Sequence, residues 1–249
     1  MKRIYHYSFL TIHWIIFIYL RLYLKINNLL KRHKPDNKNS IALLPYYPQN
    51  WPGGDRVTTW HTNFKDRGWN SNIYEAWSVE AIKSYLNDKV LNNSFSCYLL
   101  YLKLLIRRTL IFKQILSKDI IWIQRNIIPM FPFKKPYYER LLSKYHHNVI
   151  YDYYDADYES NYHLVNETVK IANKVTVASK YLKEYHSKNN KNVYFLRYCI
   201  EDSEYIKKKD SDINIVKIGW MGSPENANHL KYILNELKKI ERKYNNILF

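Results

Sequence analysis

Residues 215–226, IVKIGWMGSPEN, carry the clearest fold signal in this chain. A mostly apolar strand pattern over residues 215–220 leads into a short Gly-Ser-Pro turn, and a helical pattern then runs to Tyr244. A strand, a tight turn and a helix begin a nucleotide-binding α/β domain, because free amides at the helix N-terminus can bind a diphosphate. We therefore expect residues 213–249 to be the incomplete start of such a domain, with Gly222 and Ser223 near the diphosphate of a donor.

Short apolar segments alternate with helical patterns before that point. The pattern predicts strands at 41–44, 72–75, 119–124, 149–153, 174–178 and 193–196, and helices at 57–67, 79–91, 95–116, 137–146, 159–172 and 180–187. Repeated βα units favour a parallel sheet with helices on both faces. The predicted fold class is α/β, a Rossmann-like domain over residues 40–200 followed by the first βα unit of a second Rossmann-like domain.

Local signals support several of these boundaries. Gly68 is expected to end the helix at 57–67, and Ser179 to cap the helix at 180–187. In the segment 95–116, apolar side chains predict one buried face, and Lys103, Arg107 and Arg108 are placed on the opposite, polar face.

The composition limits the kinds of partner. The chain has 249 residues, 47% of them apolar and 16% aromatic, and a formal net charge of +17. Such a charge attracts polyanions, but no zinc-ligand spacing or RNA-binding aromatic motif is present. We therefore expect no nucleic acid partner, and instead a phosphate-bearing substrate or an anionic membrane surface. Cys97 and Cys199 form no disulfide framework and indicate free thiols in a reducing cytoplasm.

Residues 4–24, IYHYSFLTIHWIIFIYLRLYL, are mostly apolar and about as long as a membrane span. Three interpretations stay open for the N-terminal helix at 1–34. It could span the membrane, lie in the interface of an anionic leaflet, or pack on its own domain. The heavier positive charge follows the segment, which favours a cytoplasmic protein at the inner face of the membrane.

Candidate site residues follow three of the predicted strands. Gly53 and Gly54 precede the first helix of the domain, where they present amides to a ligand or simply form a turn. Arg125 follows the strand at 119–124, where an arginine holds a phosphate or carboxylate, or makes an ion pair. The catalytic residues themselves are not identified by the sequence.

Asp152, Asp155 and Asp157 crowd the end of the strand at 149–153. Carboxylates this close repel one another, so they need a cation, an arginine or hydroxyl donors. Asp155-Ala156-Asp157 reads as D-x-D, which could chelate a metal under a nucleotide diphosphate. A structural alternative is that Asp152 or Asp155 caps the next turn.

Together these segments resemble the GT-B glycosyltransferases, in particular the retaining "group 1" enzymes of family four. Residues 52–54 with 67–69 look like that family's glycine-rich loop and the turn after its first helix. Residues 121–155, IIWIQRN…PYYERLL…VIYDYYDAD, resemble its central block, and residues 218–226 resemble the start of its donor domain. The match marks Arg125, Glu139, Asp152 and Asp155. Ala156 stands where the family has a second aspartate.

The resemblance implies an enzyme that transfers a sugar from a nucleotide-sugar to a lipid-linked or polysaccharide acceptor. It implies substrate contacts for Gly53, Gly54, Arg125, Asp152 and Asp155, and no cofactor or bound metal beyond the nucleotide-sugar. The family's donor-domain lysine and Glu-x7-Glu signature would lie beyond residue 249, so a non-catalytic half that needs a separately encoded donor domain is one alternative. A metal-dependent D-x-D transferase of the GT-A type is the other.

Overall fold

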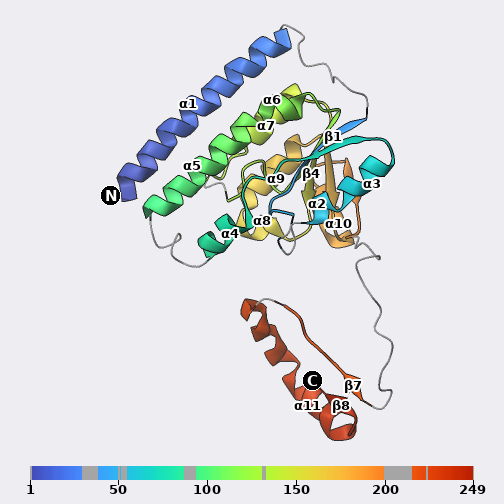
Figure 1. Ribbon diagram of the computed structural model, residues 1–249. Coiled ribbons are helices and arrows are strands. Elements are labelled where there is room, and N and C mark those ends of the chain that lie inside the picture. The colour runs from blue at the N-terminus through green and yellow to red at the C-terminus, as the bar shows by residue number, and fades with distance from the viewer. Residues whose placement is uncertain are drawn as a thin grey trace. The chain divides into compact units, whose positions relative to one another are not determined.

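The computed structural model describes residues 2–29, 39–49, 51, 55–86, 94–130, 133–198, 215–222 and 224–248. The chain divides into two compact units, Met1–Ile200 and Glu201–Phe249 (Figure 1). Gly53, Gly54 and Ser223, three of the residues singled out in the sequence, lie outside the described residues.

The first unit alternates helices and strands. Its strands are β1 (Ser40–Leu44), β2 (Asn70–Ile73), β3 (Ile120–Gln124), β4 (Val149–Tyr153), β5 (Lys174–Val177) and β6 (Val193–Phe195). Its helices are α1 (Lys2–Leu29), α2 (Asp55–Thr58), α3 (Trp60–Asp66), α4 (Val79–Leu86), α5 (Ser94–Leu110), α6 (Phe112–Leu116), α7 (Tyr137–Tyr145), α8 (Asp157–Ser160), α9 (Tyr162–Ile171) and α10 (Lys180–Ser187).

The six strands form one parallel sheet in the order β2-β1-β3-β4-β5-β6. This confirms the predicted α/β class and its parallel, Rossmann-like sheet. The strand order changes direction between β1 and β3, since β2 lies on one side of β1 and all later strands lie on the other. In open α/β sheets, ligands bind outside the carboxyl ends of the strands at such a switch point.

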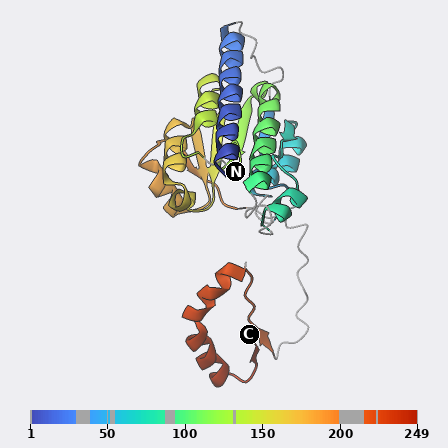
Figure 2. The ribbon, with the colours of Figure 1, turned by 90° about the vertical axis from the view of Figure 1, so that its left-hand side faces the viewer.

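Helices cover both faces of the sheet, as predicted, and the pleat explains how. Successive side chains of a strand point to opposite faces, so Ala42 and Leu44 pack in the larger core while Ile41 and Leu43 pack in the smaller one. Residues of α1, α5, α7, α9 and α10 join the larger core, and α2 and α3 cover the other face. Helix α1 lies on the outside of the larger layer, against α5 and α7 (Figure 2).

The local signals were mostly correct. Gly68 adopts φ +76° at the second residue after α3, and the Ser179 hydroxyl accepts a hydrogen bond from the Leu182 amide at 3.1 Å. The placement of Arg108 on a polar face was wrong. Its side chain is fully buried and donates to the carbonyl oxygens of Pro45 and Tyr74, at 2.9 and 2.5 Å. Arg108 therefore ties together the chain segments that follow β1 and β2, because buried carbonyl groups need a donor.

The second unit is a small βαβ arrangement. It contains β7 (Val216–Lys217), a 3-10 helix η2 (Pro224–Tyr232), α11 (Leu234–Lys243) and β8 (Ile247–Leu248), and β7 pairs with β8 in parallel. The predicted strand at 215–220 is reduced to two residues, and the first half of the predicted helix has 3-10 geometry. The assignment of this unit to a donor domain stays a prediction.

Candidate functional site

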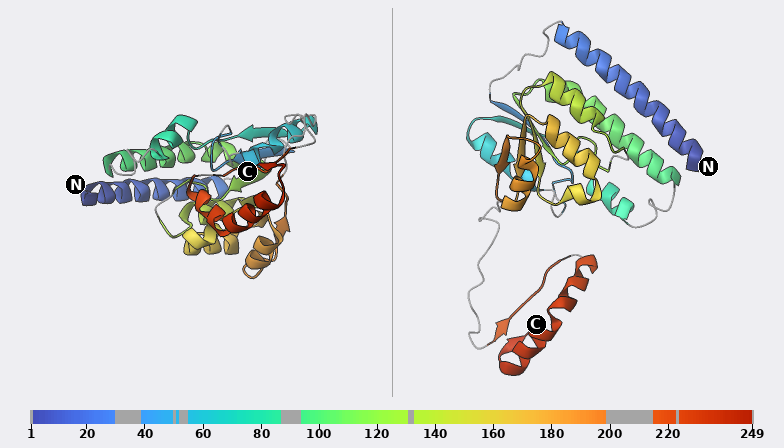
Figure 3. Two further views of the ribbon diagram at one scale, coloured as in Figure 1. Left: turned by 90° about the horizontal axis from the view of Figure 1, so that it is seen from below. Right: turned by 180° about the vertical axis from the view of Figure 1, so that it is seen from behind.

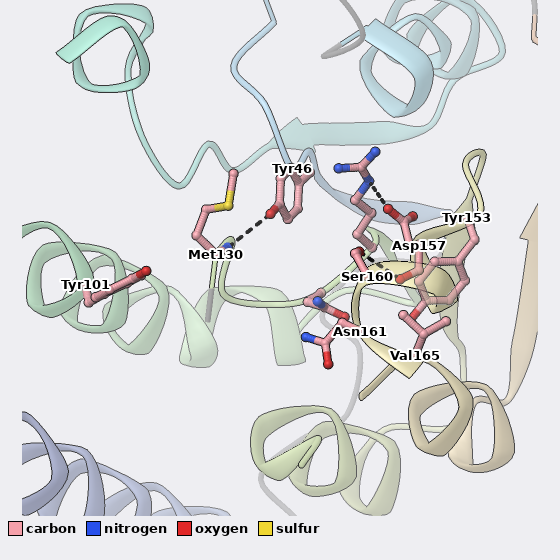
Figure 4. Close-up of a pocket in the computed structure, with 10 residues that line it drawn as sticks. Tyr46, Tyr101, Met130, Tyr153, Asp157, Ser160, Asn161 and Val165 are labelled. Atoms are coloured by element: carbon pink, nitrogen blue, oxygen red, sulfur yellow. Dashed lines mark hydrogen bonds and ion pairs between the residues drawn. The ribbon is translucent and has the colours of Figure 1, made fainter. Parts of the chain in front are cut away.

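A cavity of about 410 Å³ opens at the carboxyl ends of the central strands, within the first unit (Figure 4). Its lining comes from the segments after β1, β3 and β4, with Tyr101 of α5 at one side. Tyr46 follows β1, Arg125 and Asn126 follow β3, and Asp157 begins α8 after β4. The cavity therefore lies where the reversal of strand order places a ligand site, and its size suits a small molecule.

Arg125 is the first residue after β3 and adopts a left-handed backbone conformation, with φ +61°. Its amide donates to the carbonyl oxygen of Asp152 at 2.9 Å, which extends the β3–β4 pairing by one residue. A left-handed conformation is unfavourable for a residue with a Cβ, and such positions gather at ligand sites. Here the conformation turns the chain away from the sheet and sends the Arg125 side chain across the strand ends.

Two carboxylates hold the Arg125 guanidinium. Nη2 lies 2.5 Å from Asp155 Oδ2, and Nε lies 3.2 Å from Asp157 Oδ1. The guanidinium also faces three tyrosine rings, with its Cζ atom 4.8 Å from the centroids of Tyr46 and Tyr154 and 5.6 Å from that of Tyr47. Cation–π contacts of this kind strengthen as the cation is desolvated. Arg125 is therefore fixed in place before any ligand arrives.

Burial and charge shift the proton affinities in this cluster. Burial raises the pKa of Asp157 to about 6, against the opposing attraction of Arg125. Burial lowers the pKa of Arg125, but Asp157 and the neighbouring tyrosines more than reverse this, so its pKa lies above the ordinary value. Arg125 is thus always a cation, while Asp157 can change charge within the physiological range.

Tyr46 supports the cluster from the β1 side. Its amide donates to Gln124 Oε1 at 3.1 Å, its carbonyl accepts from Trp77 Nε1 at 2.8 Å, and its hydroxyl accepts from the Met130 amide at 3.1 Å. The hydroxyl contact is visible in Figure 4. Burial raises the pKa of Tyr46 to about 12, so the phenol stays neutral. Two backbone contacts and one contact of the hydroxyl group therefore hold Tyr46 beside Arg125.

Acceptor atoms of an amide and a carboxylate at the cavity are buried without a partner. Asn126 Oδ1 and Asp157 Oδ2 make no hydrogen bond to any part of the chain that the structure describes. Leaving a buried polar atom unpaired costs roughly 1–3 kcal/mol, so such atoms in a cavity point to a ligand or an ordered water. The arrangement offers hydrogen-bond acceptors, a fixed cation and aromatic rings, a combination that suits a ligand carrying several hydroxyl groups.

Glu139 lies behind the cavity rather than in it. Its Oε1 accepts from the Ile127 amide at 3.0 Å, so α7 holds the chain just after Arg125 and Asn126. Burial raises the pKa of Glu139 to about 7. We infer that Glu139, one of the residues that the family resemblance marked, positions this loop.

The structure brings only some of the expected site residues together at the cavity. Arg125 and Asp155 come together as an ion pair at the cavity. Asp152 is fully buried, and its oxygens accept from Arg56 and from Thr176, at 2.6 Å from Thr176 Oγ1. A substrate contact by Asp152 stays a prediction. Gly222 belongs to the second unit, where a Cβ atom would come within 2.5 Å of the exposed Trp220 ring, so a larger residue would require that ring to move.

The sequence did not point to Tyr46, Tyr101 or Asn126, and Asp157 appeared only as the second half of D-x-D. Asn126 carried a signal, since it follows Arg125 at a strand end. Tyr101 carried none, because a tyrosine on an apolar helix is usually core and only the packing of α5 brings it to the cavity.

The D-x-D carboxylates already hold a cation, namely the guanidinium of Arg125. Over the residues that the structure describes, no group of three or more His, Cys, Asp or Glu side chains is arranged to hold a metal ion.

Comparison of the sequence with protein-family models and with curated proteins gives no match.

Proposed function

We propose that the first unit is the acceptor-binding domain of a sugar transferase. The reaction would move a sugar from a nucleotide diphosphate to a hydroxyl group on a lipid-linked or polysaccharide acceptor. The observation that carries the proposal is the cavity at the β1/β3 switch point, with unpartnered acceptor atoms on Asn126 and Asp157 beside a fixed arginine. The resemblance of residues 121–155 to the retaining glycosyltransferases supports the same reaction class.

The chemistry of the cavity suits a saccharide acceptor. A sugar offers hydroxyl groups that both donate and accept, and apolar ring faces that pack on aromatic side chains. Asp157 and Asn126 can accept from hydroxyl groups, while the Tyr46 and Tyr101 rings supply the apolar walls. Because Arg125 is held before the ligand binds, little ordering is required of it on binding.

We propose that the nucleotide-sugar donor is bound by the C-terminal segment, which resembles the start of the family's donor domain. The turn at residues 218–226 fits the start of a donor domain, and Gly222 and Ser223 are the proposed neighbours of the diphosphate. A leaving diphosphate needs positive charge and helix N-termini, which the basic composition of the chain can supply.

Calorimetric titration of the purified chain tests the proposal. UDP- and GDP-sugars are titrated with and without manganese, and mono- and oligosaccharides are titrated separately. We expect saccharide binding that Asn126→Ala and Asp157→Asn weaken at least tenfold. Lys170→Ala is the control, since Lys170 pairs with Glu167 on the exposed side of α9, away from the cavity lining. Saccharide binding that the two cavity variants do not change would refute the assignment of the cavity.

The same titration separates the alternatives. Nucleotide-sugar binding without manganese supports an enzyme of the proposed type. Binding only with manganese supports the metal-dependent D-x-D transferase, although the ion pairs of Asp155 and Asp157 with Arg125 favour a metal-independent protein. Saccharide binding without nucleotide-sugar binding supports an acceptor-side half that works with a separately encoded donor domain.

A further inference from the structure

The exposed leucine and isoleucine side chains of the first unit are concentrated on two helices. Among its described residues, every exposed Leu or Ile lies on α1 or α5. They are Ile15, Ile18, Leu22, Ile26 and Leu29 on α1, and Leu99, Ile106 and Leu110 on α5. The two helices pack side by side (Figures 1 and 3). We call their combined outer side the α1–α5 face. Aliphatic side chains that gather on one exposed surface mark an interaction surface.

Helix α1 has two apolar sides with different environments. Phe9, His13, Leu20 and Leu24 recur at helical spacing and are buried against the domain. The exposed side chains of the α1–α5 face lie on the opposite side of the helix, as the period of 3.6 residues requires. The segment Tyr7–Leu29 is long and apolar enough to span a membrane. One side of this helix packs against the domain, and the other side faces outward.

Polar and aromatic contacts hold the inner side of α1 in place. His13 Nδ1 lies 2.9 Å from the Tyr138 hydroxyl of α7, and the His13 ring lies 4.6 Å from that of Phe133. A helix crossing a bilayer would have to leave these partners, because the rest of the first unit is a folded α/β domain. Helix α1 in its docked position therefore lies along the domain.

The charged side chains of α1 and α5 have a single sign. Neither α1 nor α5 contains an acidic residue. Arg21 and Lys25 are exposed on α1, and Lys103 and Arg107 are exposed on α5. Trp14 and Tyr19 add exposed aromatic side chains to α1. An apolar stripe with basic and aromatic neighbours is the pattern of a helix that lies in a membrane interface and attracts anionic headgroups.

We propose that the α1–α5 face docks in the plane of an anionic lipid bilayer while α1 stays packed on its domain. The exposed aliphatic side chains enter the boundary of the acyl chains, and the arginine and lysine side chains meet the headgroups. The sequence left three interpretations of the N-terminal helix open. The proposed docking combines two of them, because the helix packs on its own domain and also lies in the membrane interface.

One of the two helices, α5, also borders the cavity. Tyr101 of α5 lines the cavity, and its ring lies 6.0 Å from that of Phe9 on α1. Docking of the α1–α5 face would therefore bring the cavity close to the headgroups and favour a lipid-linked acceptor over a soluble polysaccharide. This consequence rests on the proposed function, whereas the docking itself does not.

Vesicle flotation of the full chain tests the docking. Vesicles of phosphatidylcholine are compared with vesicles that also contain phosphatidylglycerol. We expect binding to the anionic vesicles, reduced at least tenfold in the double variant Ile18→Glu with Leu22→Glu. Tyr162→Glu with Tyr181→Glu is the matched control, because these side chains are 59% and 65% exposed against 54% and 55% for Ile18 and Leu22. Circular dichroism confirms that both variants are folded.

Three results would overturn the proposal. One is equal binding by the double variant and the wild type. Another is protein that stays in the vesicles after alkaline carbonate washing, which indicates a spanning helix. The third is a dimer that the double variant converts to a monomer, with no vesicle binding, which assigns the face to a second copy. The cavity variant Asp157→Asn should bind vesicles as the wild type does. A loss of saccharide binding therefore tests the proposed function, and a loss of vesicle binding tests the docking.

Discussion

The guanidinium of Arg56 and the carboxylate of Asp152 form a buried bidentate ion pair, although 96 residues separate them in the sequence. Nε lies 2.7 Å from Oδ2 and Nη2 lies 3.0 Å from Oδ1. Nη2 also donates to the carbonyl oxygen of Leu196 at 2.9 Å. One ion pair therefore joins α2, β4 and the segment after β6, next to the strand ends that carry the cavity.

Replacing Arg56 by methionine should strongly destabilise the protein. The substitution leaves the Asp152 carboxylate buried without its cation, and breaking a buried pair in this way costs roughly 3–5 kcal/mol. Urea unfolding of the wild type and the variant at pH 7 gives the difference in the free energy of unfolding.

Arg140→Met is the control for that measurement. Arg140 makes an ion pair of 2.6 Å with Glu167, but both side chains are well exposed, so its loss should change the free energy of unfolding by less than about 1 kcal/mol. A loss in Arg56→Met no larger than in this control would contradict the structural role of the buried pair.

The sheet could be predicted from the sequence because its signals are local. Apolar runs at 119–124 and 149–153 are bounded by polar residues, and β3 and β4 appear there almost unchanged. The predicted helix at 57–67 was less accurate, since the structure breaks it at Thr59 into α2 and α3.

The site could be predicted only in part, because it depends on long-range pairing. Residues at strand ends, such as Arg125 and Asp155, were identified by their position relative to a strand. The partner of Asp152 was not, since nothing near Arg56 in the sequence indicates a carboxylate 96 residues away. Arg108 was assigned to the wrong face because its buried carbonyl partners belong to loops after β1 and β2.

Arg125→Gly should be more stable than Arg125→Ala. Both variants lose the ion pairs with Asp155 and Asp157, but glycine adopts the φ of +61° without the penalty that a Cβ imposes. The expected difference is about 1 kcal/mol in the free energy of unfolding. Urea unfolding measures it, and calorimetry should show that both variants lose saccharide binding. An alanine variant as stable as the glycine variant would show that the backbone at this position is unstrained.

Saccharide binding should depend on pH through Asp157. Its carboxyl has a pKa of about 6, so it is ionised and accepts hydrogen bonds above that pH and is protonated below it. For a neutral saccharide that donates to this carboxylate, the affinity should fall up to about tenfold per pH unit below 6. Calorimetry from pH 5 to pH 8 gives the profile, and Asp157→Asn should flatten it. An anionic ligand would show the opposite slope, because protonation of Asp157 leaves Arg125 with less competing negative charge.

His186→Phe should make the protein less sensitive to acid. His186 is fully buried beside the rings of Tyr153, Tyr158 and Tyr185, and neither ring nitrogen has a hydrogen-bond partner among the described residues. Burial lowers the pKa of His186 from 6.5 to about 4. Below pH 6.5 the unfolded chain therefore binds the proton more readily, and stability is lost as the pH falls toward 4.

Between pH 7.5 and pH 5 the free energy of unfolding of the wild type should fall by about 2 kcal/mol more than that of the variant, which keeps the aromatic packing without the titrating group. Urea unfolding at the two pH values measures both losses, and equal losses in the two proteins would mean that the His186 imidazole is solvated in the folded state.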